Sequence, residues 1–356
     1  MNTKYFKDTG SVKKISRLKK SCCIFIVLAL CFVLTACAAI QSGKSGAPLP
    51  VKVLILPKFE VGELSGDFPG EAQLFYENYF TDSEAFEIAG TVDGSKLYYK
   101  DGLAMYVLGE GKVNSAASLT SILLDSRLNF SNACFMTVGC GGGAYERSVI
   151  GDIVLITGVA DFDAGHRVDI RELKDDRESG WFKEDDFDQF SHVVLNQGLA
   201  DELYSLIKDI RPQLPSAAKE YMAKNFDNAA WAVRDPMVLK GSSVTSDCYW
   251  KGQYLSREAT VIAESYGLPD PFMITEMEDI AIGVVLDRAG LLDRYIGLRV
   301  NVNMDVFTGS MTPENTWGDE VEETLLADDE TAGCFQDNMK NLFEVSDLVI
   351  DYLTNK

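Results

Sequence analysis

The sequence predicts one α/β domain over 51–356, folded as a three-layer α/β/α sandwich around a mostly parallel or mixed central sheet. Short apolar runs bounded by glycine alternate along the chain with longer segments of helical period. Strands that alternate with helices form a sheet that is covered by helices on both faces. Neither an internal repeat nor a second flexible linker interrupts this region, so we expect a single domain.

Five apolar runs predict the strands of this sheet. They lie at 52–57, 103–108, 133–138, 153–159 and 296–302. Each run has the length of a strand and is too short for a typical helix. The glycine-rich segment 139–143 follows the third run, and we expect it to form a loop where that strand ends.

Amphipathic segments predict the helices that cover the sheet. The first begins at Lys112. Its expected apolar face consists of Val113, Ala116, Ala117, Thr120 and Leu124. Further helices are expected at 197–209, 214–224, 254–266, 276–289 and 336–353. The segment 276–289 is followed by Gly290, a residue type that commonly ends helices.

Residues 1–36 have the pattern of a secretory signal peptide. Seven lysines and arginines and one acid precede thirteen consecutive apolar residues at 22–34. The following Leu34-Thr35-Ala36-Cys37 resembles the lipobox of bacterial lipoproteins, which implies cleavage before Cys37 and attachment of a diacylglycerol to its sulfur. The alternative is an uncleaved signal anchor, because the apolar stretch extends to Ile40.

A flexible linker is expected at 37–50, where glycine, serine and proline are frequent. With a lipid on Cys37, the domain at 51–356 would lie at the cell membrane, on its extracytoplasmic face. No other apolar run approaches the length that spans a bilayer. The sequence therefore predicts a lipid-anchored protein that contacts the membrane through its anchor.

The composition disfavours several classes of function. Aspartate and glutamate outnumber lysine and arginine by 54 to 33, a net charge of -21, which disfavours nucleic acid and anionic lipid surfaces as partners. The sequence has two histidines and no metal-binding spacing of cysteine and histidine, so we predict no metal site. Whether any disulfide joins Cys134, Cys140, Cys248 and Cys334 is left open.

Three segments carry a resemblance to a known superfamily. They are 109–117 (GEGKVNSAA), 138–143 (VGCGGG) with Ile150-Gly151-Asp152 after it, and 275–278 (TEME) with Asp305 after the next strand. In this order they resemble the nucleoside phosphorylase/nucleosidase superfamily, which implies that superfamily's sandwich fold and a purine nucleoside as ligand. Segments 159–182 and 245–250 (TSDCYW) further resemble the purine nucleoside permease family.

Gly141, Gly142 and Gly143 are candidate contacts for the purine base. Because these residues have no side chains, backbone N–H and C=O groups can meet the edge of a flat ligand directly. A tight turn after a strand is the alternative explanation for the same glycines. The resemblance implies that Tyr249 stacks on the base, whereas Trp250 is explained equally well as a core aromatic residue.

Met277 and Glu278 are candidate contacts for the ribose. A carboxylate can accept hydrogen bonds from two vicinal hydroxyl groups, and a thioether offers an apolar contact to the sugar. The resemblance assigns the ribose to Glu278. The alternative is an acid in the first turn of a helix, where the helix dipole favours it, and we expect Glu276 and Asp279 to be only that.

Asp305 is the candidate catalytic residue. The resemblance implies that it protonates the purine as the N-glycosidic bond breaks. The preceding Asn303 and Met304 depart from the small residue and the serine of the superfamily's enzymes. Glu60 and Glu63 follow the first strand, where a base that activates water is expected, and surface acids are the alternative explanation for both.

A phosphorylase would need cations that bind phosphate. Lys58, Lys112 and Arg147 are available, but no phosphate-binding motif is recognisable. We therefore expect no cofactor, with phosphate left as a possible co-substrate.

These features support three functional hypotheses. The first is an extracytoplasmic lipoprotein that binds purine nucleosides and supports nucleoside uptake, together with a separate membrane transporter, since one anchored domain cannot carry a solute across a bilayer. The second is an enzyme, a phosphorylase or hydrolase, that cleaves the N-glycosidic bond outside the cytoplasm. The third is a scaffold that keeps only the fold, which the retained Glu278 disfavours. Whether the protein is an enzyme is left open.

Overall fold

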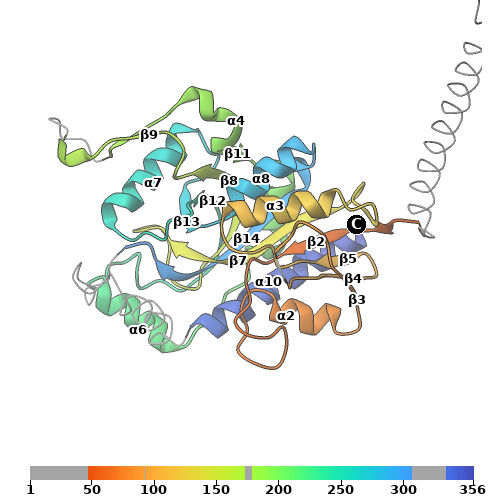
Figure 1. Cartoon of the computed structure of the whole chain (residues 1–356). Helices are drawn as coiled ribbons and strands as arrows, with labels where there is room; N and C mark the ends of the chain where they lie inside the picture. The colour runs from red at the N-terminus through yellow and green to blue at the C-terminus, as the bar shows by residue number, and fades with distance from the viewer. Residues whose placement is uncertain (1–46, 93, 173–178, 307–333) are drawn as a thin grey trace, which may run out of the picture. The chain divides into compact units, whose positions relative to one another are not determined.

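A mixed sheet of ten strands forms the centre of the computed structural model, which describes residues 47–92, 94–172, 179–306 and 334–356 (Figure 1). The described residues from Leu49 onward form one compact unit. The strand order is β11-β8-β12-β13-β7-β2-β5-β4-β3, and the tenth strand, β14, pairs with both β7 and β8.

Six strands make the middle of the sheet. They are β2 Val53–Leu56, β7 Cys134–Gly143, β8 Ile153–Asp161, β12 Val238–Thr245, β13 Phe272–Glu276 and β14 Tyr295–Met304. The pairs β2–β7, β7–β14, β8–β12 and β12–β13 are parallel, and β7–β13 and β8–β14 are antiparallel. These pairings close β8, β12, β13, β7 and β14 into a ring. Gly142 of β7 thereby lies between Thr275 of β13 and Asn303 of β14.

Shorter strands complete the sheet. One edge is formed by β5 Leu103–Met105, β4 Leu97–Lys100 and β3 Glu84–Phe86. The other edge is β11 His192–Val194, which pairs antiparallel with β8. Two separate ladders join β1 Leu49–Pro50 to β6 Leu128–Asn129, and β9 His166–Arg167 to β10 Trp181–Phe182.

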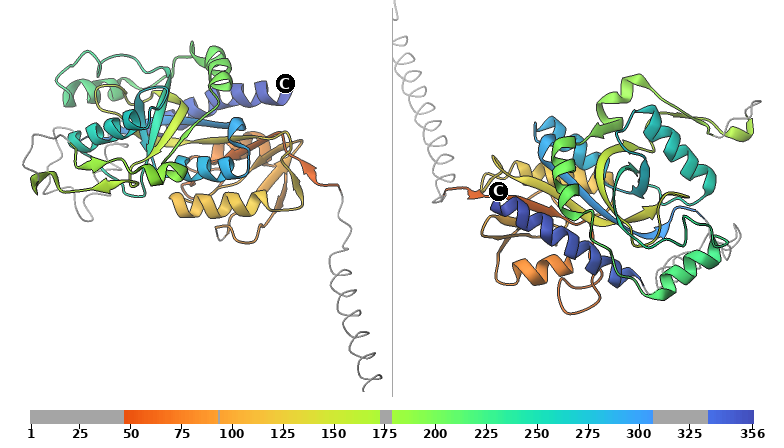
Figure 2. Two further views of the ribbon diagram at one scale, coloured as in Figure 1. Left: turned by 90° about the horizontal axis from the view of Figure 1, so that it is seen from above. Right: turned by 180° about the vertical axis from the view of Figure 1, so that it is seen from behind.

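Helices cover both faces of the sheet (Figures 1 and 2). One face carries α3 Lys112–Leu123 and α8 Asp279–Arg288. The other carries α5 Gln197–Ile207, α10 Phe335–Asn355 and the short α2 Gln73–Phe75. The remaining helices are α7 Gln253–Ser265, which contacts β8, β12 and β13, α6 Ser216–Asn225 and α4 Asp188–Ser191. Shorter helical turns occur at Tyr76–Phe80, Ile170–Glu172, Asp185–Phe187 and Leu292–Arg294.

The side chains of β2 show how the two helical layers attach to the sheet. Leu54 and Leu56 belong to the buried cluster that includes α3 and α8. Val53 and Ile55 belong to the cluster that includes α5 and α10. Because successive side chains of a strand point to opposite faces, this all-apolar strand is buried from both sides. The structure confirms the predicted three-layer α/β class, with a sheet of the mixed kind.

Several predicted boundaries were wrong. The segment 139–143, expected as a loop, is the second half of β7. The helix expected at 276–289 begins only at Asp279, because Glu276 still belongs to β13. Neither β12 nor β13 was predicted. β12 (VLKGSSVT) buries Ser242 and Ser243 and therefore lacks the apolar run by which the other strands were recognised.

The predicted apolar face of α3 was also wrong. Val113 and Leu124 are 78% exposed. The helix instead buries Ser115, Ser118, Leu119 and Ile122. Ser115 Oγ donates to the carbonyl oxygen of Gly109 at 3.1 Å, and Ser118 Oγ donates to that of Leu108 at 3.0 Å. These bonds satisfy the buried hydroxyl groups, so polar residues can face the sheet.

In the described part of the chain, no helix combines the length and apolar character that crossing a membrane requires. The predicted signal peptide 1–36 and the predicted lipidation site Cys37 lie outside the described residues, as does most of the predicted linker 37–50.

Candidate functional site

A cavity of about 200 Å³ lies where β7, β13 and β14 end. Six of the residues selected from the sequence line it: Gly141, Gly142, Tyr249, Met277, Glu278 and Asp305. The seventh, Gly143, does not line the cavity, and its carbonyl oxygen accepts the N–H of Asp305 at 3.0 Å. The fold thus brings together candidate base, ribose and catalytic residues that are up to 164 positions apart in the sequence.

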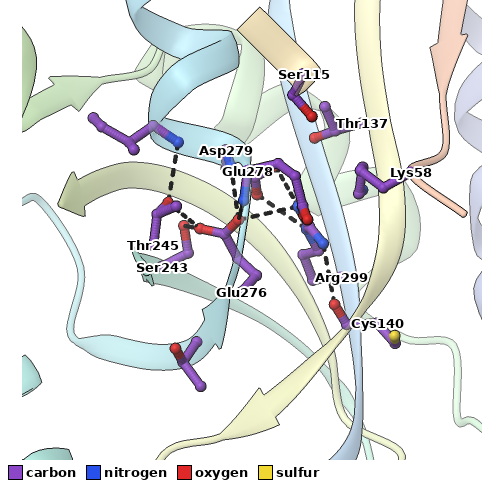
Figure 3. A network of polar contacts seen from close by, with 12 residues as sticks. Lys58, Ser115, Thr137, Cys140, Ser243, Thr245, Glu276, Glu278, Asp279 and Arg299 are labelled. Atoms are coloured by element: carbon purple, nitrogen blue, oxygen red, sulfur yellow. Dashed lines mark hydrogen bonds and ion pairs between the residues drawn. The ribbon is translucent and has the colours of Figure 1, made fainter. Parts of the chain in front are cut away.

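A buried arginine, Arg299 of β14, is the centre of charge in the cavity wall (Figure 3). Its side chain is 1% exposed. Nη2 contacts carboxylate oxygens of Glu276 at 3.1 Å, Glu278 at 3.2 Å and Asp279 at 2.6 Å. Nη1 donates to the carbonyl oxygen of Cys140 at 3.1 Å. Sequence reasoning missed Arg299, because it reads as a polar interruption of an otherwise apolar strand.

Asp279 lies in the first turn of α8, as the sequence suggested, whereas Glu276 is the last residue of β13. Both are buried against Arg299. Glu276 Oε2 also accepts the N–H groups of Glu278 and Asp279, each at 2.7 Å, at the start of α8. Its Oε1 accepts hydrogen bonds from Ser243 and Thr245. Glu276 therefore caps the helix from the end of β13 and holds the following turn in place.

Glu278 directly precedes α8, and hydrogen bonds from other parts of the protein hold its carboxylate in place. It is 4% exposed, and burial raises the pKa of its carboxyl group, an effect that Arg299 and Lys58 oppose. Oε1 accepts the N–H of Gly111 at 3.1 Å and Oε2 accepts from Arg299. A carboxylate oxygen has two acceptor positions, so each oxygen keeps one for a ligand hydroxyl group.

Lys58 and Glu71 form a second buried pair in the cavity wall. Lys58 Nζ donates to the carbonyl oxygen of Val138 at 2.6 Å and lies 3.7 Å from Glu71 Oε2. Glu71 also accepts the N–H groups of Lys58 and Cys140, both at 2.8 Å. Sequence reasoning missed Glu71, which no motif marks.

The two acids proposed from the sequence as a base do not line the cavity. Glu60 accepts backbone N–H groups of Val61, Gly70, Ala72 and Gln73. Glu63 is exposed. Glu60 thus fastens the loop after β2 to the start of α2, and Glu71 is the carboxylate that this loop brings into the cavity.

Asp305 presents one oxygen without a protein partner. The residue is 1% exposed. Oδ1 accepts the N–H of Tyr145 at 3.1 Å, while Oδ2 has no hydrogen-bond partner among the described residues. Burial raises the pKa of this carboxyl group to about 8, against smaller opposing effects of Ser256, Tyr145 and Lys251. At neutral pH the group is mostly protonated and can donate a hydrogen bond.

Tyr249 lies at the mouth of the cavity and is 51% exposed. Its hydroxyl oxygen accepts a hydrogen bond from Asn303 Nδ2 at 2.5 Å. Trp250 is buried and stacks on Phe162, with ring centroids 5.0 Å apart. Both residues line the cavity, but Trp250 is fixed by packing in the core and Tyr249 remains accessible.

A model of the purine nucleoside permease family matches residues 50–356. The chain belongs to the purine nucleoside permease family. A probable purine nucleoside permease of Schizosaccharomyces pombe is 25% identical over 232 residues, which cover 57% of this chain and 65% of that protein. The match thus spans less than two thirds of the length of this relative.

Two solved structures resemble this permease-family chain. The 5′-methylthioadenosine/S-adenosylhomocysteine nucleosidase of Neisseria meningitidis has 16% identity and a TM-score of 0.47, covering 83% of this chain and 98% of its own. The futalosine hydrolase of Helicobacter pylori has 15% identity and a TM-score of 0.48, covering 83% of this chain and 97% of its own.

The other cations proposed from the sequence do not line the cavity of this permease-family chain. Lys112 Nζ contacts Asp161 at 3.0 Å and Asp163 at 2.8 Å. The backbone N–H of Lys112 donates to Asp247. Lys112 thereby ties α3 to the loops after β8 and β12.

Within the described residues, no group of acidic residues, cysteines and histidines could hold a metal ion, and no disulfide joins two cysteines.

Proposed function

We propose that the chain is a lipid-anchored, extracytoplasmic protein that binds purine nucleosides and supports their uptake. The observation that carries the proposal is one cavity that combines three kinds of group. Asp305 offers a hydrogen-bond donor to a ring nitrogen, Tyr249 an accessible aromatic ring, and Glu278 a carboxylate with open acceptor positions. These groups suit a purine base and a ribose diol.

The charges of the cavity wall favour a neutral ligand over phosphate. Lys58 and Arg299 are the cations among the described lining residues, and both already contact buried carboxylates. The remaining ionisable lining residues are acids: Glu71, Glu110, Glu276, Glu278 and the mostly protonated Asp305. Since anions are usually held by unpaired cations and free N–H groups, this wall supports binding of a nucleoside without phosphate.

Calorimetry of the full-length protein in detergent tests the proposed ligand class. Adenosine and guanosine stand for purines, and uridine for pyrimidines. Tighter binding of a purine nucleoside than of uridine is expected, because the larger base offers more area to stack on Tyr249. Tighter binding of uridine, or no binding of any nucleoside, would contradict the proposal.

Cleavage of the N-glycosidic bond is the second candidate function, and one observation favours it. Asp305 carries a buried, protonated oxygen that could give its proton to the purine as the bond from the sugar carbon to the base nitrogen breaks. Water would then supply hydroxide to the sugar carbon, with its proton taken by a carboxylate such as Glu71. Chromatography of protein incubated with adenosine, with and without phosphate, distinguishes turnover to free base from binding alone.

Cys37→Ser is expected to abolish lipid attachment, because serine lacks the sulfur that forms the thioether bond. The variant should lose the mass of the diacylglycerol and move from the membrane fraction to the soluble fraction or remain unprocessed. Mass spectrometry and fractionation of native and variant protein, expressed in a bacterium, check this. Cys134→Ser serves as the control, since it removes a thiol from β7 and leaves the lipobox intact. Unchanged mass and fractionation in Cys37→Ser would show that the lipobox interpretation is wrong.

Affinity for adenosine is expected to fall as the pH rises through about 8. The pKa of Asp305 is raised to about 8, so the donor form is present below that pH and lost above it. Beyond that point the dissociation constant should rise by up to about tenfold per pH unit. Asp305→Asn keeps an N–H donor at all pH values and should remove this dependence. Calorimetry from pH 6 to pH 9.5 measures it, and an identical pH profile in both proteins would rule out Asp305 as the donor.

A further inference from the structure

Two polar side chains line the cavity where β14 ends: Asn303 is the last but one residue of the strand, and Asp305 comes just after it. Both lie beside Gly142: a β-carbon on that glycine would lie 3.1 Å from Asn303 Oδ1 and 3.8 Å from the β-carbon of Asp305. Asn303 lies opposite Gly142 in the pairing of β14 with β7. A base bound against Gly142 would therefore meet both side chains along one of its edges.

Asn303 presents its two polar atoms to different neighbours. Nδ2 donates to the hydroxyl oxygen of Tyr249 at 2.5 Å. Oδ1 points towards Gly142, where a β-carbon, if present, would lie 3.1 Å from it. No hydrogen bond to Oδ1 occurs among the described residues. Tyr249 accepts one of the two N–H groups of Nδ2 and holds the amide in this orientation, so the atom that Asn303 turns towards Gly142 is an acceptor.

Asp305 offers the opposite kind of group. Its Oδ1 is occupied by the N–H of Tyr145, and its Oδ2 is buried with no partner among the described residues. Burial raises the pKa of this carboxyl group to about 8, so the protonated form predominates at neutral pH. The cavity therefore presents a donor from Asp305 next to an acceptor from Asn303.

We infer that Asn303, oriented by Tyr249 and acting beside Asp305, selects 6-aminopurine nucleosides over 6-oxopurine nucleosides. The inference rests on the proposed function and names the substrate class of the same site. Along the edge that carries N7, adenine presents an acceptor at N7 and a donor at its 6-amino group, whereas guanine and hypoxanthine present two acceptors. The donor of Asp305 and the acceptor of Asn303 match adenine. With a 6-oxopurine, two oxygen atoms with lone pairs would face each other at Asn303.

Calorimetry of the full-length protein with related nucleosides tests each contact separately. Adenosine is expected to bind with an affinity at least about tenfold higher than that of inosine. Purine riboside, which has no substituent at position 6, should lie between them, because it neither donates to Asn303 nor repels it. 7-Deazaadenosine, which lacks the N7 acceptor, should bind worse than adenosine through the loss of the Asp305 contact alone.

Two variants connect the selectivity to its cause. In Asn303→Ala the affinities for adenosine, purine riboside and inosine should converge, while the preference for adenosine over 7-deazaadenosine persists. In Tyr249→Phe the Asn303 amide loses its partner and can turn its NH₂ group to a 6-oxopurine, so the adenosine-to-inosine ratio should fall by severalfold. The ratio of adenosine to 2′-deoxyadenosine should stay unchanged in Asn303→Ala, which shows that the rest of the site is intact.

The outcomes separate this inference from the proposed function. Equal or tighter binding of inosine by the native protein overturns the inference and leaves purine nucleoside binding standing. An undiminished preference for adenosine in Asn303→Ala overturns the role of Asn303. If no nucleoside binds, the proposed function fails, and the inference fails with it.

Discussion

Arg299→Met is expected to lower the free energy of unfolding by about 3–5 kcal/mol. The native side chain is 1% exposed and contacts the carboxylates of Glu276, Glu278 and Asp279. Methionine fills much of the same volume but leaves these acids buried together without their cation. Breaking a buried ion pair by removing one partner is costly, because the remaining charges have lost both water and their partner.

Urea unfolding followed by tryptophan fluorescence measures this loss. Arg171→Met is the matched control, because Arg171 pairs with Asp169 on the surface with its side chain 85% exposed, and its removal should change stability little. Asp279→Asn added to Arg299→Met should recover part of the loss, since it removes one of the unpaired charges. A midpoint for Arg299→Met no lower than that of Arg171→Met would contradict the central role of the arginine.

The strands that could be predicted from the sequence are those in which consecutive buried residues are apolar. Leu54 and Ile55 face opposite layers, and both are apolar, so β2 could be recognised from its composition alone. β12 could not be recognised in this way, because its Ser242 and Ser243 are buried as polar residues. Ser242 Oγ donates to the carbonyl oxygen of Asp270, a partner 28 positions away that only the folded chain brings near.

The residues of the candidate site likewise fall into those that the sequence could identify and those that only the folded structure reveals. Gly142, Tyr249, Glu278 and Asp305 were selected because each belongs to a short motif that resembles a known family. The resemblance gave no signal for Arg299, because its role comes from three acids that precede it by 20 to 23 positions. Periodicity cannot distinguish a buried ion pair from a polar interruption of a strand, since the pairing is a property of tertiary contacts.

Glu276 shows how a correct local rule can give the wrong role. Acids do favour the start of a helix, and α8 does begin at Asp279. The rule places the acid within the first helical turn, however, whereas Glu276 belongs to the strand before the helix and reaches forward to its first N–H groups. The capping interaction was therefore predictable, and the burial that turns it into part of the cavity wall was not.

Glu278→Ala is expected to weaken adenosine binding about ten- to a hundredfold, the loss of about 1.5–3 kcal/mol that a hydrogen bond to a charged group contributes. Gly111 and Arg299 occupy one acceptor position on each carboxylate oxygen and so fix the plane of the carboxylate. The ribose diol can then donate to the two open positions without any cost of orienting the side chain. Glu110→Ala is the matched control, because it removes the same charge from the wall of the same cavity.

A cycle with 2′-deoxyadenosine isolates the contact. The deoxynucleoside should bind the native protein more weakly than adenosine, and Glu278→Ala should weaken its binding less, because one of the two hydroxyl groups is already absent. The two changes should therefore be less than additive, with a coupling of about 1 kcal/mol or more. Calorimetry on native protein, Glu278→Ala and Glu110→Ala with both ligands measures it, and thermal unfolding of each variant shows whether the site is still folded. Simple additivity would mean that Glu278 does not contact the 2′-hydroxyl group, and that its carboxylate serves only to neutralise Arg299.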